Sequence, residues 1–220
     1  MGKPDLTSAA EDFLKAVLEL ERVGGKATTN GLAARLDVAA PTATAMAKRL
    51  DEQGLVERTP YRGVTLTDRG RLVALEVLRH HRLLELYLAD TLGMPLAEVH
   101  AEADRLEHVL SETVEQRIDE ALGFPTHDPH GDPIPDSDLR LAEATGAVLA
   151  TLDVGSVATI VRVPDGDSAV LRYLTDLAIA PGGSIEVVER APFGGPVTVR
   201  VAGEDHALAH ELAERIGVAV

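Results

Sequence analysis

The sequence predicts a mainly α-helical protein with a small β domain, and three observations support this fold class. Apolar residues recur at helical spacing through most of residues 8–122. Residues 123–140 are rich in proline and glycine, and neither a regular helix nor a central strand is compatible with that composition. Short β-branched runs separated by Gly-Gly turns fill residues 157–201. We therefore predict three domains, over residues 1–72, 73–140 and 150–220.

The first domain has the element order of a winged helix-turn-helix. A first helix starts at Thr7 or Ser8, where Glu11 helps to form a capping box. A short second helix follows Thr28, and a third is expected over residues 41–53. Two short apolar stretches around a basic turn predict the hairpin that makes the wing, over residues 55–57 and 64–66.

The third helix is expected to contact double-stranded DNA. Small and polar residues at its start suit close approach to the major groove, and basic residues there and in the hairpin turn can reach phosphates. The formal net charge of −15 does not oppose this, because residues 1–71 carry +1 and the remainder −16. The alternative is a three-helix packing module without DNA. The candidate DNA contacts are Pro41, Thr42, Thr44, Lys48, Arg49 and Arg62.

The helix expected over residues 67–88 is apolar on more than one face, as helices buried between subunits are. Helix-turn-helix proteins usually read two half-sites as symmetric dimers. We therefore expect a homodimer on palindromic DNA, with residues 73–122 as the dimerisation unit.

Histidines and carboxylates in this middle region indicate a metal site. If residues 96–121 form one helix, His100, Asp104, Glu107 and His108 project from a single stripe among apolar residues. Buried imidazoles and carboxylates are costly unless paired, protonated or ligated, and a divalent cation would satisfy all of them. His81 and Glu85 form a second pair at helical spacing. For either pair alone, an ordinary hydrogen bond is the alternative.

The segment of residues 123–140 adds two candidate ligands, Asp128 and His130. Its prolines and spacing exclude an EF-hand, and the alternative is a solvated proline-rich connector. In the C-terminal part, strands are expected over residues 157–163, 184–188 and 197–201, with short helices over 171–177 and 206–216. This pattern predicts a small SH3-like β-barrel.

Several classes of protein are excluded or disfavoured. The absence of cysteine excludes disulfides, thiolate zinc sites and a cysteine nucleophile, and it fits a cytoplasmic location. With no run of about 18 apolar residues, no membrane span is expected. Phosphate loops and hydrolase motifs are lacking, and so are the paired Glu-x-x-His motifs of dinuclear helical enzymes, so we predict no enzyme and no organic cofactor. A winged-helix regulator that senses an organic ligand remains the alternative of another class.

These residues together resemble the diphtheria toxin repressor and manganese transport regulator family of metal-dependent bacterial repressors. The resemblance covers nearly the whole chain. It rests on the winged helix, on residues 81–85 (HRLLE), on residues 99–108 (VHAEADRLEH) and on the segment from Phe124-Pro125 to Pro133-Ile134-Pro135. The C-terminal part is similar to that family's SH3-like, FeoA-related domain. The resemblance implies a repressor of metal homeostasis genes, in which bound metal fixes the dimer geometry for operator binding.

The resemblance also implies two or more metal sites per subunit. The family's primary, activating site corresponds to Asp12, Asp104, Glu107 and His108. Its ancillary site corresponds to His81, Glu85 and His100. Ligands that some members take from the later loop and the SH3-like domain correspond to Asp128 and His130, with Asp165 or Asp167 as a further candidate.

Two positions set the expected metal. Iron-responsive relatives carry Met and Cys where this chain has Asp12 and Asp104. Hard oxygen donors suit Mn(II) better than sulfur does, so we expect Mn(II), with Fe(II) as the alternative. Lys15 stands where some two-domain manganese regulators place a second carboxylate, so their two-manganese arrangement is not expected here.

Overall fold

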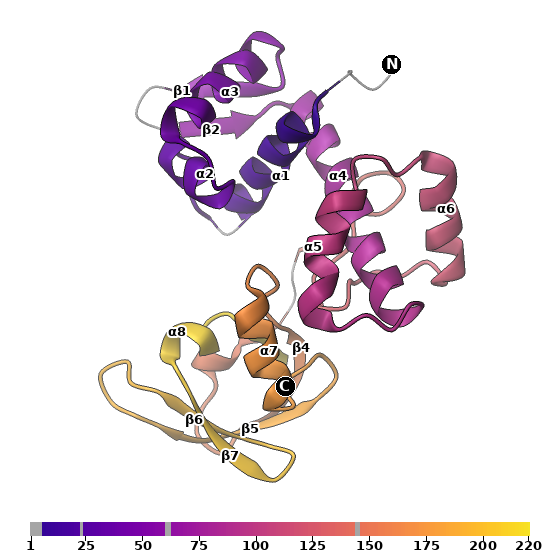
Figure 1. Cartoon of the computed structure of the whole chain (residues 1–220). Coiled ribbons are helices and arrows are strands. Elements are labelled where there is room, and N and C mark those ends of the chain that lie inside the picture. Colours follow the sequence, from indigo (N-terminus) through magenta and orange to yellow (C-terminus); the bar gives the residue numbers. More distant parts are fainter. Residues whose placement is uncertain (1–5, 23, 60–62, 144–145) are drawn as a thin grey trace. The chain divides into compact units, whose positions relative to one another are not determined.

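A computed structural model describes residues 6–22, 24–59, 63–143 and 146–220 (Figure 1). The chain divides into two compact units. The first unit holds the chain up to His81 together with Leu106–Ser111 and Pro135–Leu141. The second holds Arg82–Arg105, Glu112–Ile134 and Ala142–Val220. Among the described residues, no helix has both the length and the apolar character that crossing a membrane requires.

The first unit is built around three short helices and a hairpin. Its elements are α1 (Ser8–Arg22), α2 (Thr29–Arg35), α3 (Ala40–Glu52), β1 (Val56–Thr59), β2 (Gly63–Leu66) and the start of α4 (Asp68–Asp90). The Thr28 side chain caps α2 by accepting from the Gly31 amide, and Pro41 lies in the first turn of α3. Buried residues of all three helices form one aliphatic core with Phe13, so the position of α1 is tied to that of α3.

The start of α4 is fixed against the hairpin at Gly70. A Cβ added at Gly70 would lie only 1.8 Å from the carbonyl oxygen of Leu55, so no other residue fits there without a backbone shift. The Thr67 hydroxyl donates to the carbonyls of Gly54 and Leu55 at the same place. The wing and the long helix are therefore held together by close backbone packing.

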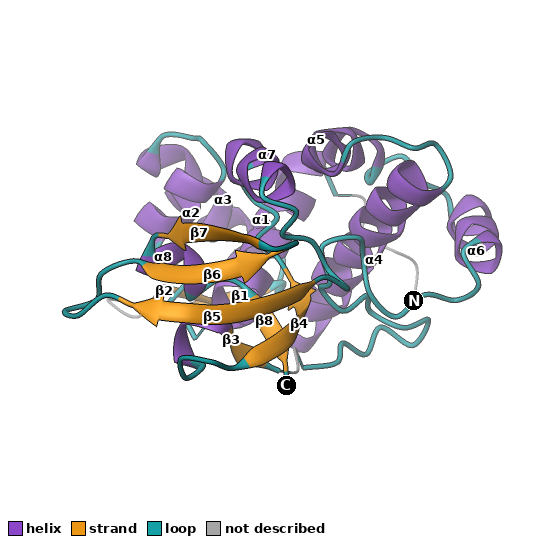
Figure 2. Ribbon diagram, turned by 90° about the horizontal axis from the view of Figure 1, so that it is seen from below, coloured by secondary structure: helices purple, strands orange, loops and turns teal. Residues whose placement is uncertain are grey.

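The second unit combines helices with a six-stranded antiparallel sheet (Figure 2). Its helices are the rest of α4, α5 (Leu96–Leu106), α6 (Glu112–Ala121), α7 (Ser168–Asp176) and α8 (His210–Ala213), with a 3₁₀ turn at Leu149–Thr151. The strands are β3 (Ala147–Val148), β4 (Val157–Arg162), β5 (Ser184–Arg190), β6 (Val197–Val201), β7 (Glu204–Leu208) and β8 (Gly217–Ala219). Their order in the sheet is β3-β8-β4-β5-β6-β7. The prediction of a mainly α-helical chain with a small β domain is confirmed.

Residues 122–134, the part of the proline-rich loop that belongs to the second unit, dock directly on the sheet. The Val163 amide donates to the His130 carbonyl over 2.9 Å. Gly131 has a φ of +90°, and a Cβ there would lie 1.8 Å from the Val161 carbonyl oxygen. Arg82 of α4 donates to the carbonyl of Pro133. The loop is thus held in place by both the sheet and α4, and its side chains have defined positions.

Two sequence-based predictions of secondary structure are wrong. The condition that residues 96–121 form one helix is not met, since α5 ends at Leu106, Glu107 and His108 lie in the following turn, and α6 is a separate short helix, as the pattern of residues 111–122 predicts. From this turn, the side chains of Glu107 and His108 contact Lys15 and Glu11 of α1. The helix expected over residues 206–216 is reduced to α8, because His206 to Leu208 extend β7, which pairs in register with β6.

Candidate metal centres

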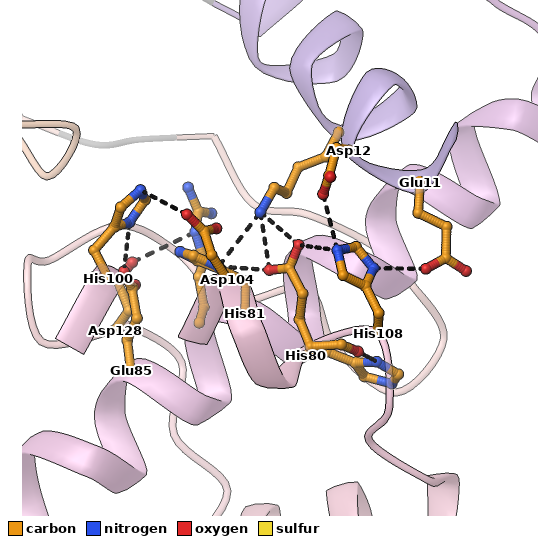
Figure 3. A network of polar contacts seen from close by, with 12 residues as sticks. Glu11, Asp12, His80, His81, Glu85, His100, Asp104, His108 and Asp128 are labelled. Atoms are coloured by element: carbon orange, nitrogen blue, oxygen red, sulfur yellow. Dashed lines mark hydrogen bonds and ion pairs between the residues drawn. The ribbon is translucent and has the colours of Figure 1, made fainter. Parts of the chain in front are cut away.

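Two groups of potential metal ligands each lie within one compact unit. Figure 3 shows Asp12 and His108 of the first group and Glu85 and Asp128 of the second. The first, which we call the α1 cluster, consists of Asp12, Glu107 and His108. The second, the loop cluster, consists of Glu85, Asp128 and His130. In each group, one ligand atom per residue lies within 4.8 Å of the others.

His108 is the centre of the α1 cluster. Its Nε2 lies 2.9 Å from Asp12 Oδ1 and 3.5 Å from Glu107 Oε1, and its Nδ1 lies 2.7 Å from Glu11 Oε2. The hydrogen bond to Asp12 raises the pKa of His108 to about 9, with the Glu11 hydrogen bond adding to the effect and burial opposing it. At neutral pH the imidazolium therefore holds these carboxylates together by donating from both ring nitrogens.

Glu107 is a fully buried carboxylate with several partners. Lys15 Nζ lies 2.7 Å and 2.9 Å from its two oxygens, and His81 Nδ1 lies 2.6 Å from Oε2. The Lys15 side chain is itself only 11% exposed. Burying an ionised carboxylate is costly unless it is paired, and here a lysine of α1 supplies the opposite charge.

The loop cluster is more deeply buried. Asp128 Oδ1 accepts from the amides of His130 and Asp132, each over 2.9 Å, which fixes the carboxylate within the loop. Asp128 Oδ2 is 3.4 Å from Arg82 Nε and makes no hydrogen bond among the described residues. Neither ring nitrogen of His130 makes one, and Nδ1 lies 3.6 Å from Glu85 Oε2.

The pKa values of the loop cluster reflect this environment. Burial raises the pKa of Asp128 to about 7, and the nearby Glu85 carboxylate adds to the shift. Burial alone would lower the pKa of His130, but the carboxylates of Glu85, Asp128 and Asp165 outweigh it and raise that pKa. Buried polar atoms that lack hydrogen bonds are expensive, and a divalent cation would satisfy them. Carboxylate oxygens and imidazole nitrogens are suitable donors for Mn(II) or Fe(II), so the residues fit such an ion.

The remaining predicted ligands are placed as follows. His100 Nδ1 lies 2.9 Å from Glu85 Oε1, and its Nε2 lies 3.6 Å from Asp104 Oδ2, so these three residues gather in the second unit. His81 contacts Glu107 in the first unit. Asp167 caps α7 by accepting from the amides of Ala169 and Val170.

Sequence reasoning missed the side-chain roles of two residues and left a third undecided. Glu11 was assigned to helix capping, yet it is 6% exposed and contacts His108. Lys15 stands out in the sequence only as a departure from relatives, yet its ammonium group pairs with Glu107. The carboxylate of Asp165 helps to raise the pKa of His130. The signal for Glu11 and Lys15 was available, because charged residues interrupt an otherwise apolar face of α1.

The predicted DNA contacts lie on α3, apart from Arg62, which lies outside the described residues. Those on α3 are exposed: Pro41, Thr42, Thr44, Lys48 and Arg49. The Thr44 hydroxyl donates back to the Ala40 carbonyl over 2.9 Å. The exposed face of α3 thus carries small, polar and basic side chains, the types that direct contact with DNA requires.

Three family models match the chain in order. Residues 5–64 match the iron dependent repressor N-terminal DNA binding domain, and residues 67–136 match the iron dependent repressor metal binding and dimerisation domain. Residues 148–220 match the FeoA domain.

Relatives and solved structures match over nearly the full length. The iron-dependent repressor IdeR of Mycobacterium tuberculosis is 37% identical, over 97% of this chain and 98% of the relative. The diphtheria toxin repressor of Corynebacterium diphtheriae is 31% identical, over 97% of this chain and 98% of the relative. A manganese-dependent transcriptional repressor solved in complex with manganese is 38% identical, with a TM-score of 0.89 over 96% of this chain and 99% of that one.

Proposed function

We propose a Mn(II)-activated transcriptional repressor, starting from the fact that the chain belongs to the iron-dependent, diphtheria toxin repressor family. Members of this family are metal-dependent repressors and not enzymes. The finer proposal is that this chain acts in the cytoplasm as a homodimer, binds a palindromic operator through α3, and controls metal homeostasis genes. Fe(II) is the alternative effector.

The chemical nature of the candidate ligand atoms supports the choice of Mn(II). The α1 cluster offers two carboxylates and one imidazole, and the loop cluster offers the same combination. The chain contains no cysteine, so a thiolate cannot enter either cluster. Hard oxygen donors lower the advantage of softer metals and favour Mn(II).

We further propose two or more metal sites per subunit. The α1 cluster is the activating site, to which the resemblance adds Asp104. The loop cluster is the second site, to which the resemblance adds His81 and His100. Asp165 is a better candidate than Asp167 for a further ligand from the FeoA domain, because it acts on His130 whereas Asp167 caps a helix.

A bound divalent cation would supply positive charge and fixed coordination among carboxylates that otherwise rely on protons and Lys15. Contacts within the protein would transmit the effect of metal binding to the helix expected to contact DNA. Asp12 belongs to α1, whose buried face shares one core with α3. Holding Asp12 against Glu107 and His108 therefore restrains α1 and, through the core, the helix expected to enter the major groove. Because such coupling is reciprocal, operator DNA should tighten metal binding by the same factor.

Operator binding at buffered metal concentrations tests the proposal. A labelled operator is titrated with the full chain while free Mn(II) and free Fe(II) are buffered in separate anaerobic series. Binding that appears at lower free Mn(II) than Fe(II), and is lost with EDTA, supports a manganese sensor. Activation by Fe(II) at a much lower free concentration than that of Mn(II) would identify Fe(II), and not Mn(II), as the effector. Metal-independent binding would refute the sensor itself.

A further inference from the structure

We propose that Glu11 is a positioning residue for His108: its carboxylate holds the Nδ1 proton of the imidazole and leaves Nε2 facing Asp12 and Glu107. This inference rests on the proposed metal function of the α1 cluster, but it assigns a role to a residue outside the ligand set.

The burial of Glu11 is the first observation. Glu11 is 6% exposed, although it lies in the first turn of α1, where a capping glutamate would ordinarily be solvated. Its Oε2 lies 2.7 Å from Nδ1 of His108, which is 97 positions away in the chain. A buried carboxylate needs a compensating partner, and this one is aimed at the candidate ligand.

The geometry of the imidazole is the second observation. Consecutive residues of α1 hold its two nitrogens, with Glu11 at Nδ1 over 2.7 Å and Asp12 at Nε2 over 2.9 Å. Figure 3 shows the two carboxylates on opposite sides of the ring. The ring of His108 therefore has one orientation, with a different nitrogen assigned to each carboxylate.

These contacts decide which nitrogen is available to a cation. A neutral imidazole binds metal through one nitrogen and keeps a proton on the other, and the hydrogen bond at the second nitrogen selects the tautomer. An ionised carboxylate can only accept, so Glu11 keeps the proton on Nδ1. Nε2 is then the nitrogen left to join the oxygens of Asp12 and Glu107, and Nδ1 is excluded as a ligand.

A purely structural role for Glu11 makes a different prediction. If Glu11 only stabilised the start of α1, its loss would lower stability without changing which nitrogen of His108 meets the metal. The test therefore measures directly which nitrogen of His108 binds the metal. The full-length protein with ¹⁵N-labelled histidine is loaded with ¹¹³Cd(II), a diamagnetic probe, and the His108 nitrogens are followed by NMR. Mn(II) affinity is measured in parallel.

Three variants separate the outcomes. Wild type should bind Cd(II) through Nε2 of His108 with the proton on Nδ1. Glu11→Ala should lose the single Nε2 coordination and about 10- to 100-fold in Mn(II) affinity, the usual cost of removing such a partner. Glu11→Gln keeps an acceptor oxygen and should retain Nε2 coordination with an intermediate affinity. Glu19→Ala, which removes an α1 carboxylate paired with Arg35, should behave as wild type.

Failure of the proposed role of Glu11 and failure of the proposed metal site give different results. Unchanged Nε2 coordination and affinity in Glu11→Ala would overturn the role of Glu11 while leaving the metal site intact. No response of wild-type His108 to Cd(II) would overturn the metal function of the α1 cluster, and the inference with it. If Glu11→Ala does not fold, Glu11→Leu makes the same comparison, because it fills the buried space without offering an acceptor.

Discussion

Lys15 Nζ lies 2.7 Å and 2.9 Å from the two carboxylate oxygens of Glu107, so a side chain of α1 neutralises a fully buried carboxylate of the α1 cluster. In the metal-free protein this contact ties α1 to the turn after α5 without any ion. A divalent cation bound at the α1 cluster would therefore compete with Lys15 for the charge of Glu107.

Replacing Lys15 with methionine should separate stability from metal binding. Lys15→Met leaves the buried Glu107 carboxylate without its lysine partner, and breaking a buried ion pair costs about 3 kcal/mol or more. Metal-free protein should lose that much stability in urea denaturation with EDTA. The apparent Mn(II) affinity should rise, because a tethered competitor is removed. Lys26→Met, at an exposed position, is the control, and equal stability of the two variants would argue against this role of Lys15.

Mn(II) binding to the α1 cluster should release a proton. Because the pKa of His108 is raised to about 9, its Nε2 is protonated at neutral pH and must lose that proton to become a ligand. Apparent Mn(II) affinity should therefore rise about tenfold per pH unit between pH 6.5 and 8. Calorimetry in buffers of different ionisation enthalpy measures the proton directly. His108→Gln should lose this proton release. An unaltered release in that variant would show that the proton comes from another group.

The metal-free protein should lose stability as pH rises from the ordinary pKa of an aspartate, 3.8, to the folded-state pKa of Asp128, about 7. The folded-state pKa of Asp128 is about 7 against an ordinary value of 3.8, so between these values the folded protein retains a proton that the unfolded chain has released. Stability then falls with rising pH, by about 1.4 kcal/mol per unit from this group.

Asp128→Asn isolates this effect. The amide oxygen can still accept from the amides of His130 and Asp132, but the side chain carries no charge. Urea denaturation with EDTA should show the variant gaining on wild type as pH rises from 4 to 7. Mn(II) should stabilise wild type at pH 7.5 more than the variant. A constant difference between the two proteins across this pH range would contradict the raised pKa.

Local sequence signals predicted most of the fold. The cap at Thr28, the proline at the start of α3 and the glycine-rich turns of the C-terminal part act within a few residues, and the corresponding elements are present. The composition of the proline-rich loop correctly predicted irregular backbone. The end of α5 at Leu106 was missed, because it depends on contacts of Glu107 and His108 with a helix far away in the chain.

The site was predictable by residue type but not by pairing. The sequence identified His108 and Glu107 as candidate ligands, since histidines and carboxylates recur there at close spacing. It did not show that Lys15 and Glu11 are their partners, because those contacts span 92 and 97 positions and are decided by tertiary packing. The extension of β7 through His206 was missed for the same reason, since pairing with β6 outweighs the local preference.

The close approach of the loop to the sheet gives a last prediction, at Gly131. An alanine Cβ there would lie 1.8 Å from the Val161 carbonyl oxygen, so Gly131→Ala must push the loop off β4 and displace His130. Gly155→Ala is the matched control, because Gly155 has a similar φ of +85° but no atom within 4 Å of an added Cβ. The control should cost about 1 kcal/mol of backbone strain, and Gly131→Ala clearly more. Only Gly131→Ala should also lower the number of Mn(II) ions bound per subunit, measured by equilibrium dialysis. If both variants bind as many ions as wild type, the loop cluster does not depend on this contact with the FeoA domain.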